Sequence, residues 1–359
     1  MDVLLGRRDT NKEVRPRRWR DRNARRKMRR SDVFLCELCP KNCRIREGQS
    51  GDCRVRIVID GELRAVTYGR PCAVHVDPVE KKPLFHVMPG SRIFSLATAG
   101  CNLHCKFCQN WTISQAAPED IRNVPLSPHR VVESATSQKC RSIAYTYTEP
   151  VVFYEYVLDT AALARQAGLL NVTVTAGYIN KEPLERLCNV VDASNTDLKG
   201  FSDAFYRELC EASLKPVLDG MITMKERGVW LEITNLVIPT FNDDLDMIRR
   251  MCKWILAYLG SETPIHFSRF YPMYKVRNLP PTPVDILMRA REVALEIGLQ
   301  YVYVGNVLGT EGESTYCPSD GTLLIRRTGF SVLENHLVND ACPTCGCTIP
   351  GIWGFRGTG

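Results

Sequence analysis

The sequence predicts an α/β protein: a partial TIM-like (β/α)6 barrel with a small cysteine-rich metal module on either side. Short apolar runs alternate with helical patterns in the middle of the chain, and cysteines cluster in three places. Basic residues gather at the N-terminus. The expected organisation is a basic tail over 1–30, an N-terminal module over 31–90, the barrel over 91–308 and a C-terminal module over 312–359.

The N-terminal tail carries the positive charge of the chain. Residues 1–30 contain thirteen Lys and Arg against four Asp and Glu, whereas the whole 359-residue chain has a net charge of +7. The remainder of the chain is therefore slightly acidic. Such an arm can bind RNA, DNA or an acidic partner. A disordered extension is favoured instead, because Trp19 is its one aromatic residue and no folded RNA-binding motif follows.

The N-terminal module holds four cysteines within eighteen residues, namely Cys36, Cys39, Cys43 and Cys53. Two short strands are expected over 53–59 and 62–66, around a tight turn at Asp60-Gly61. Four metal-bound thiols would supply folding energy that so small a core lacks. The spacing suits an auxiliary iron–sulfur cluster or a structural zinc and does not separate the two.

Seven apolar runs in the central segment are expected strands: 93–98, 142–147, 171–175, 193–198, 229–238, 265–270 and 301–304. Helical patterns lie between them, as over 150–168, 244–260 and 283–298, and each of these three ends at a glycine. This alternation indicates a parallel sheet with helices outside. In such barrels the chemistry collects at the carboxyl ends of the strands, so those positions supply the candidate site residues.

A loop with three cysteines follows the first of these strands. Cys101, Cys105 and Cys108 have the spacing C-x3-C-x2-C, with Phe107 just before the last thiol. Three thiolates on one loop can hold three irons of a [4Fe–4S] cluster and leave the fourth iron open to a cofactor. A disulfide set would need an oxidising compartment, and no secretory signal is visible. A zinc site would use paired knuckles, whereas the nearest further cysteines are isolated.

Polar residues stand at three further strand ends. Glu149 either binds the amino group of an amino-acid-like cofactor or is an ordinary acid at a helix start. The third strand ends at Thr175, beside Gly177, which suits a close backbone approach to a ligand. Asp197 and Lys199 are alternate residues of the fourth strand, so their side chains are expected on one face.

The C-terminal module contains two cysteine–proline turns typical of zinc-ribbon or rubredoxin-like sites. A fourth cysteine is replaced by aspartate, which can bind zinc through oxygen. The expected ligands of a zinc or iron ion are Cys317, Asp320, Cys342 and Cys345. Cys347 is the alternative fourth ligand, and a site that has lost its metal is the other alternative.

The barrel segment resembles the glycyl-radical-enzyme activases of the radical S-adenosylmethionine (SAM) superfamily. The three loop cysteines correspond to the cluster ligands of that family, and Phe107 to an aromatic residue near adenine. The resemblance implies that Glu149 binds the amino group of SAM. Thr175 is a further candidate cofactor contact because it stands at the end of the third strand. The resemblance also implies that Asp197 and Lys199 hold the SAM carboxylate. Tyrosine and threonine stand before Glu149 where the family has two glycines.

A wider likeness covers nearly the whole chain beyond the tail. The sequence is similar to the radical SAM member of the AmmeMemoRadiSam system, a homologue of pyruvate formate-lyase activase. The patterns that carry this likeness are C-x2-C-P-x2-C from Cys36, D-P-x-E-K-K-P-L-x-H from Asp77 to His86, and C-Q-N-W from Cys108. The likeness implies AMMECR-like and MEMO-like partner proteins, and an electron donor such as ferredoxin or flavodoxin.

The implied function is reductive cleavage of SAM at a [4Fe–4S] cluster, which yields methionine and a 5′-deoxyadenosyl radical that abstracts hydrogen from a substrate. The alternatives are a glycyl-radical-enzyme activase acting on a protein backbone, or a non-catalytic iron–sulfur protein for electron transfer or scaffolding. Residues 77–86 either line the substrate mouth or form a solvated linker, and His266 is a further candidate substrate contact. No apolar stretch reaches the ~18 residues of a membrane span. Clustered thiols favour the reducing cytoplasm.

Overall fold

The computed structural model describes residues 33–354, so the expected basic tail over 1–30 lies outside the described residues. An eight-stranded sheet with the order β12-β11-β10-β9-β8-β7-β6-β5 forms the centre of the molecule. Seven of its strands are parallel to their neighbours: β6 (Arg92–Ala97), β7 (Ser142–Tyr145), β8 (Leu170–Thr175), β9 (Ala193–Asp197), β10 (Trp230–Val237), β11 (Ile265–Arg269) and β12 (Val302–Gly305). These are the seven predicted strands, within two residues at nearly every end.

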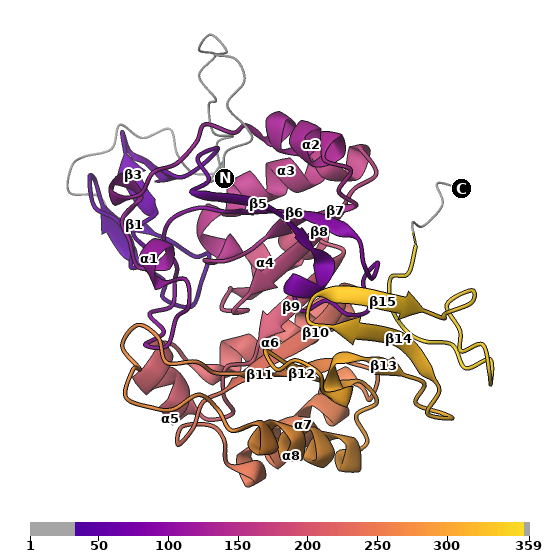
Figure 1. The fold of residues 1–359 in the computed structure, drawn as a ribbon. Helices are drawn as coiled ribbons and strands as arrows, with labels where there is room; N and C mark the ends of the chain where they lie inside the picture. The colour runs from indigo at the N-terminus through magenta and orange to yellow at the C-terminus, as the bar shows by residue number, and fades with distance from the viewer. Residues whose placement is uncertain (1–32, 355–359) are drawn as a thin grey trace.

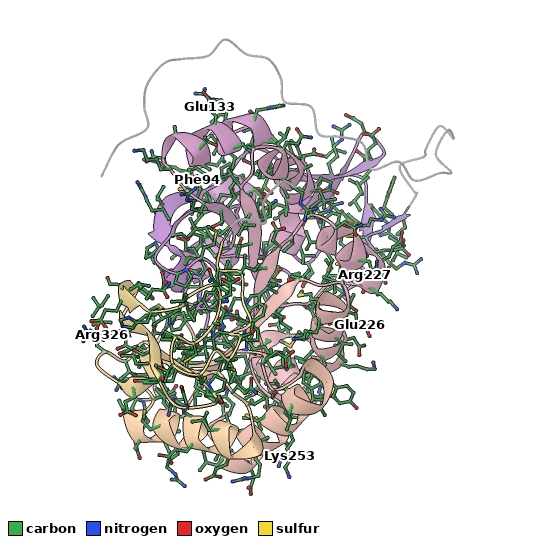
Figure 2. The ribbon with its side chains drawn as sticks, turned by 90° about the vertical axis from the view of Figure 1, so that its right-hand side faces the viewer. Phe94, Glu133, Glu226, Arg227, Lys253 and Arg326 are labelled. Atoms are coloured by element: carbon green, nitrogen blue, oxygen red, sulfur yellow. The ribbon has the colours of Figure 1, made fainter. Side chains whose placement is uncertain are left out.

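Helices connect these strands and cover the outer face of the sheet (Figure 1). The longer ones are α2 (Pro128–Ser137), α3 (Tyr154–Gln166), α4 (Lys181–Cys188), α6 (Leu214–Glu226), α7 (Leu245–Leu259) and α8 (Val284–Ile297). Their ends follow local signals: Asp244 caps α7, accepting from the amides of Asp246 and Met247, and Gly260 ends it with a φ of 93°. Figure 2 shows Glu133 on α2 and Lys253 on α7 at the exposed outer surface.

The sheet is an open barrel, because β12 pairs with β11 alone and β5 with β6 alone among the described strands. The predicted partial TIM-like barrel is therefore confirmed. Short elements fill the loops at the carboxyl ends of the strands and elsewhere: η1 (Val79–Lys81), α1 (Trp111–Ser114), η2 (Pro118–Asp120), η3 (Pro150–Phe153), α5 (Asp203–Phe205), the π-helical turn η4 (Tyr206–Cys210) and η5 (Glu311–Glu313).

The strand β5 (Ala73–Pro78) departs from the predicted organisation. It runs antiparallel to β6, with Ala73 opposite Ala97, although residues up to 90 were grouped with the N-terminal module. The residues after β5 cross the amino-terminal end of the barrel, where Val79, Leu84 and Val87 pack against the parallel strands. No periodic apolar pattern marked this edge strand, because most of its residues are half-buried and do not alternate between core and solvent.

The two modules contain short strands only. In the N-terminal one, β1 (Val33–Leu35) pairs with β2 (Arg44–Arg46), and β3 (Arg56–Ile59) pairs with β4 (Glu62–Ala65) across the predicted Asp60-Gly61 turn. In the C-terminal one, β13 (Thr315–Tyr316), β14 (Leu323–Thr328) and β15 (Ser331–Asn335) form a three-stranded sheet. None of the described helices is long and apolar enough to cross a bilayer.

Candidate active site and metal centres

The predicted cysteine loop leaves the carboxyl end of β6. Cys101 and Cys105 are buried and Cys108 is half-buried. Gly100, just before the loop, has a φ of +86°, and a Cβ there would lie 2.6 Å from the carbonyl oxygen of Cys53. Only glycine fits this approach. The turn η4 supports the other side of the loop, because the amides of His104 and Lys106 donate to its carbonyl oxygens at 3.0 and 2.8 Å.

A fourth thiol, which the sequence did not single out, lies beside this loop. Cys210 is fully buried at the end of η4, and its hydrogen bond with the Cys105 thiol lowers the pKa of Cys105. Burial raises the pKa of Cys101 well above its usual value. An isolated cysteine offers no spacing pattern, so only the fold brings Cys210 to the loop.

The loop fits the cluster that its spacing predicts. Three buried or half-buried thiols on one loop are the type of soft donor that binds the irons of an iron–sulfur cluster. Among the described residues, the sulfur atoms of these three cysteines do not all lie within 4.8 Å of one another, whereas the ligand atoms of the C-terminal module do. His104 is not a ligand candidate, since its ring nitrogens contact Gln115 and Asp52 at 2.7 and 2.9 Å.

Glu149 is fully buried at the carboxyl end of β7. Its carboxylate accepts hydrogen bonds from the Thr175 hydroxyl at 2.6 Å and the Ala176 amide at 2.8 Å. It also caps η3, accepting from the Val151 amide at 3.4 Å, as expected of an acid at a helix start. Burial raises the pKa of Glu149 to about 7. A cationic ligand would favour the charged carboxylate.

Asp197 and Lys199 form the expected pair at the end of β9. The Lys199 ammonium lies 2.8 Å from Asp197 Oδ2, and its charge acts on both Cys105 and Glu149. The negative charge of Glu149 acts in turn on Cys101. The candidate residues of four strand ends therefore lie within electrostatic reach of one another. Phe107 is buried and packs against Phe205, with ring centroids 5.9 Å apart.

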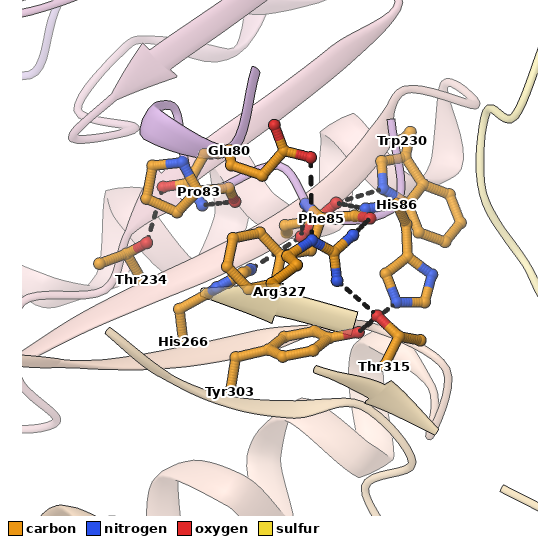
Figure 3. Close-up of polar contacts among 12 residues, drawn as sticks. Glu80, Pro83, Phe85, His86, Trp230, Thr234, His266, Tyr303, Thr315 and Arg327 are labelled. Carbon is orange, nitrogen blue, oxygen red and sulfur yellow. Dashed lines mark hydrogen bonds and ion pairs between the residues drawn. The ribbon is translucent and has the colours of Figure 1, made fainter. Parts of the chain in front are cut away.

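A second polar cluster lies at the opposite, amino end of the strands (Figure 3). Glu232, near the start of β10, is fully buried and contacts His266 Nε2 at 2.7 Å. It also accepts from the backbone amides of Phe85 and His86 at 3.0 and 2.8 Å. Tyr303 lies between the two histidines and contacts His86 Nε2 at 2.7 Å.

This arrangement corrects two expectations. His266 and His86 do not line a substrate mouth, because both are buried at the end of the barrel away from the cysteine loop. Their role is to fasten residues 79–90 under the barrel, with Arg327 Nη2 donating to the Phe85 carbonyl at 2.7 Å. Lys82 and Asp77, 2.7 Å apart, are also buried, so these residues are not a solvated linker either.

The C-terminal module gathers the four predicted ligands. Atoms of Cys317, Asp320, Cys342 and Cys345 all lie within 4.8 Å of one another. The sulfurs of Cys317 and Cys345 are 3.5 Å apart, and Asp320 Oδ2 lies 3.7 Å from the Cys342 sulfur. Zinc–sulfur bonds of about 2.3 Å in a tetrahedron place ligands about 3.8 Å apart, so this set fits one metal ion. Cys347 is outside the set.

Comparison with known proteins identifies the barrel. The family model of the radical SAM superfamily matches residues 95–253. The chain is 48% identical over 313 residues to the uncharacterized protein MJ0808 of Methanocaldococcus jannaschii, covering 87% of this chain and 93% of that protein. It is 23% identical over 181 residues to the pyruvate formate-lyase-activating enzyme of Listeria monocytogenes, covering 46% and 70% of the two chains.

Among solved structures, Streptococcus suis SuiB bound to S-adenosylmethionine has a TM-score of 0.48 and 12% identity, over 67% of this chain and 56% of SuiB. The family match covers β6 to β10 and includes the cysteine loop and the strand ends described above. The chain belongs to the radical SAM superfamily and is an enzyme that cleaves SAM reductively at a [4Fe–4S] cluster.

Proposed function

We propose that Cys101, Cys105 and Cys108 hold this cluster, and that Glu149 and Lys199 bind the amino-acid end of SAM. One observation carries the proposal: buried thiols, a buried carboxylate and a lysine meet at the carboxyl ends of adjacent parallel strands. Parallel barrels place their reactive groups at this edge. When bound, the cluster supplies the electron that breaks a carbon–sulfur bond of SAM.

The charges of these side chains match those of the proposed ligand. An α-amino acid end carries one ammonium and one carboxylate group, which suit the Glu149 carboxylate and the Lys199 ammonium. Thr175 orients Glu149 through a hydrogen bond of 2.6 Å, and Asp197 orients Lys199 through one of 2.8 Å. Phe107 is proposed as the adenine neighbour on the basis of the sequence resemblance, and it is held in place by Phe205.

The loop between β11 and α8 covers part of the barrel mouth. Its Lys275 amide donates to the Lys106 carbonyl at 2.9 Å, and its Tyr274 ring stacks on Trp111 with centroids 5.1 Å apart. In this position the loop would help to exclude water from a bound cluster, which protects a radical from side reactions. A substrate must reach it past this loop.

A protein substrate, as for a glycyl-radical-enzyme activase, is the second candidate. It is favoured by exposed apolar side chains after three consecutive strands: Phe241 at 46%, Tyr271 at 41% and Leu308 at 76% exposure. A contiguous exposed apolar patch beside a site is typical of a docking surface. The AMMECR-like and MEMO-like proteins are proposed partners on the sequence likeness alone. A one-electron donor is required, and the clustered thiols favour a reducing, cytoplasmic location. The domain division at residues 31–90, 91–308 and 312–359 is likewise a proposal, in which β5 of the first segment joins the barrel sheet.

The test is SAM cleavage under anaerobic conditions. The protein is reconstituted with iron and sulfide, reduced and mixed with SAM, and 5′-deoxyadenosine is quantified. We expect product from the native protein and from Cys140→Ala, a buried cysteine on the outside of the sheet. Cys105→Ala should give none. A full cluster without product, even after addition of cell extract, would instead identify an electron-transfer or scaffold protein.

A further inference from the structure

The four thiols of the N-terminal module surround one small pocket. Cys36, Cys39, Cys43 and Cys53 all line it, and three of them are buried. The β1–β2 hairpin brings the first three together, since the Cys36 amide donates to the Cys43 carbonyl at 2.9 Å. The fourth arrives from the loop before β3. None of these thiols belongs to the SAM site.

Backbone amides point at each of the four sulfur atoms. The donor and acceptor pairs are Leu38 to Cys36, Lys41 to Cys39, Asp52 to Cys43 at 3.4 Å, and Val55 with Arg56 to Cys53. Amide hydrogen bonds to sulfur stabilise thiolates and tune the potentials of iron–sulfur clusters. A neutral thiol in a buried pocket has no use for this many donors.

A buried cation lies against the same pocket with one polar atom unsatisfied. Arg56 is 5% exposed, lines the pocket and donates to Glu155 at 2.7 Å. Its Nε has no hydrogen-bond partner among the described residues. Its charge acts on the sulfurs of Cys36 and Cys53. Glu155 already pairs with this guanidinium through Nη1, so metal-bound thiolates would supply the negative charge that faces its unpaired Nε.

The arrangement of these thiols in space favours an iron–sulfur cluster over a single zinc ion. Zinc holds its four ligands about 3.8 Å apart, a spacing that the C-terminal set approaches. The N-terminal thiols share a pocket, yet no three of them come within 4.8 Å of one another in the described structure. A polynuclear cluster needs thiols that lie farther apart than the ligands of a single ion, because its thiolates bind different iron atoms.

We infer that Cys36, Cys39, Cys43 and Cys53 hold a second iron–sulfur cluster, and that Arg56 balances its negative charge. Every iron of this cluster has protein ligands, so it suits electron transfer and not the binding of SAM. The inference does not depend on the ligands proposed for the first cluster.

The second site is fastened to the back of the SAM loop. Asp52, next to Cys53, contacts His104 of that loop at 2.9 Å. The Asn102 side chain of the loop hydrogen-bonds the sulfur of Cys39, and Gly100 packs against the carbonyl of Cys53. The segments that carry the two sets of thiols are therefore in direct contact, which suits a cluster that passes electrons to its neighbour.

The experiment counts iron in the full-length chain after removal of either set. Protein is reconstituted anaerobically with iron and sulfide, desalted, assayed for iron, sulfide and zinc, and reduced for electron paramagnetic resonance. The triple variant Cys101→Ala/Cys105→Ala/Cys108→Ala should lose SAM cleavage but retain about two or four irons per chain, with a signal that SAM does not change. Cys39→Ala/Cys53→Ala should retain only the SAM-sensitive signal.

Cys72→Ala, a cysteine outside all three sets, should retain both signals. The triple variant leaves the N-terminal module intact, so it remains decisive even where the double variant fails to fold. The inference is wrong if the triple variant binds no iron, or only a single iron without sulfide as the C-terminal set would, or if Cys39→Ala/Cys53→Ala loses one equivalent of zinc and no iron. Neither result depends on the SAM assay. The triple variant lacks the proposed ligands of the first cluster, so it should not cleave SAM whether or not the second cluster exists.

Discussion

The hydroxyl of Thr175 donates a hydrogen bond to the Glu149 carboxylate over 2.6 Å, and so joins the carboxyl ends of β8 and β7. Glu149 is fully buried, and burial raises its pKa to about 7. The free protein therefore keeps a proton on this carboxyl group over a range in which an exposed glutamate has lost it. A bound ammonium group favours the charged form, so the proposed contact of Glu149 with SAM would couple SAM binding to release of this proton.

The first prediction concerns that coupling. Below pH 7 the affinity for SAM should fall about tenfold per pH unit, because Glu149 must first lose its proton. Glu149→Gln should bind SAM weakly and with no such dependence. Equilibrium dialysis of cluster-loaded protein from roughly pH 5.5 to about pH 7 measures this dependence. Glu133→Gln, at the surface, should behave as the native chain. A pH slope that survives Glu149→Gln would assign the proton elsewhere.

The second prediction uses two glycines that both have positive φ. Gly168 has a φ of +73° and nothing within 4 Å of an added Cβ, whereas at Gly100 the Cβ would lie 2.3 Å from Val55 and 2.6 Å from the Cys53 carbonyl. Gly168→Ala should cost only the backbone strain, about 1–2 kcal/mol of unfolding free energy. Gly100→Ala should in addition lower the iron content, because it pushes the two cysteine sets apart. Equal iron content in both variants would contradict this account.

The third prediction concerns Glu232, which binds residues 85 and 86 to the barrel. Glu232→Gln leaves an amide group facing backbone donors in a buried site, and should lower the free energy of unfolding by about 3 kcal/mol. Urea unfolding measures the change. The exposed ion pair of Glu133 with Arg130 provides the control, and Glu133→Gln should change stability by less than about 0.5 kcal/mol. Folded Glu232→Gln protein should still cleave SAM, since the proposed SAM site is at the other end of the strands. Loss of cleavage by folded protein would place Glu232 in the reaction.

The fourth prediction separates the two alternatives for the C-terminal metal. Asp320 lies in the ligand set and Cys347 does not. Asp320→Ala should therefore lower the affinity for zinc by at least about tenfold, and Cys347→Ser should leave it unchanged. Competition with a chromophoric chelator measures both. The opposite order of affinities would make Cys347 the ligand.

Local sequence patterns were sufficient to predict much of the fold and of the candidate site. The loop from Cys101 to Cys108 and the seven parallel strands are defined by spacing and by short apolar runs, which involve only near neighbours in sequence. The pairing of Asp197 with Lys199 follows from the two-residue period of a strand. The gathering of strand ends at one edge follows from the parallel sheet that alternation implies.

The sequence by itself thus determined the barrel, the cysteine loop and the class of cofactor that the family uses. Only the tertiary structure decided where isolated residues lie: Cys210 beside Cys105, and His266 at the amino end of the barrel with Glu232. It also brings Asp320, and not Cys347, close to the other three candidate ligands of the C-terminal module. Each of these contacts joins residues distant in sequence. Their proximity depends on how whole elements pack, and no periodicity or spacing within a segment encodes that packing.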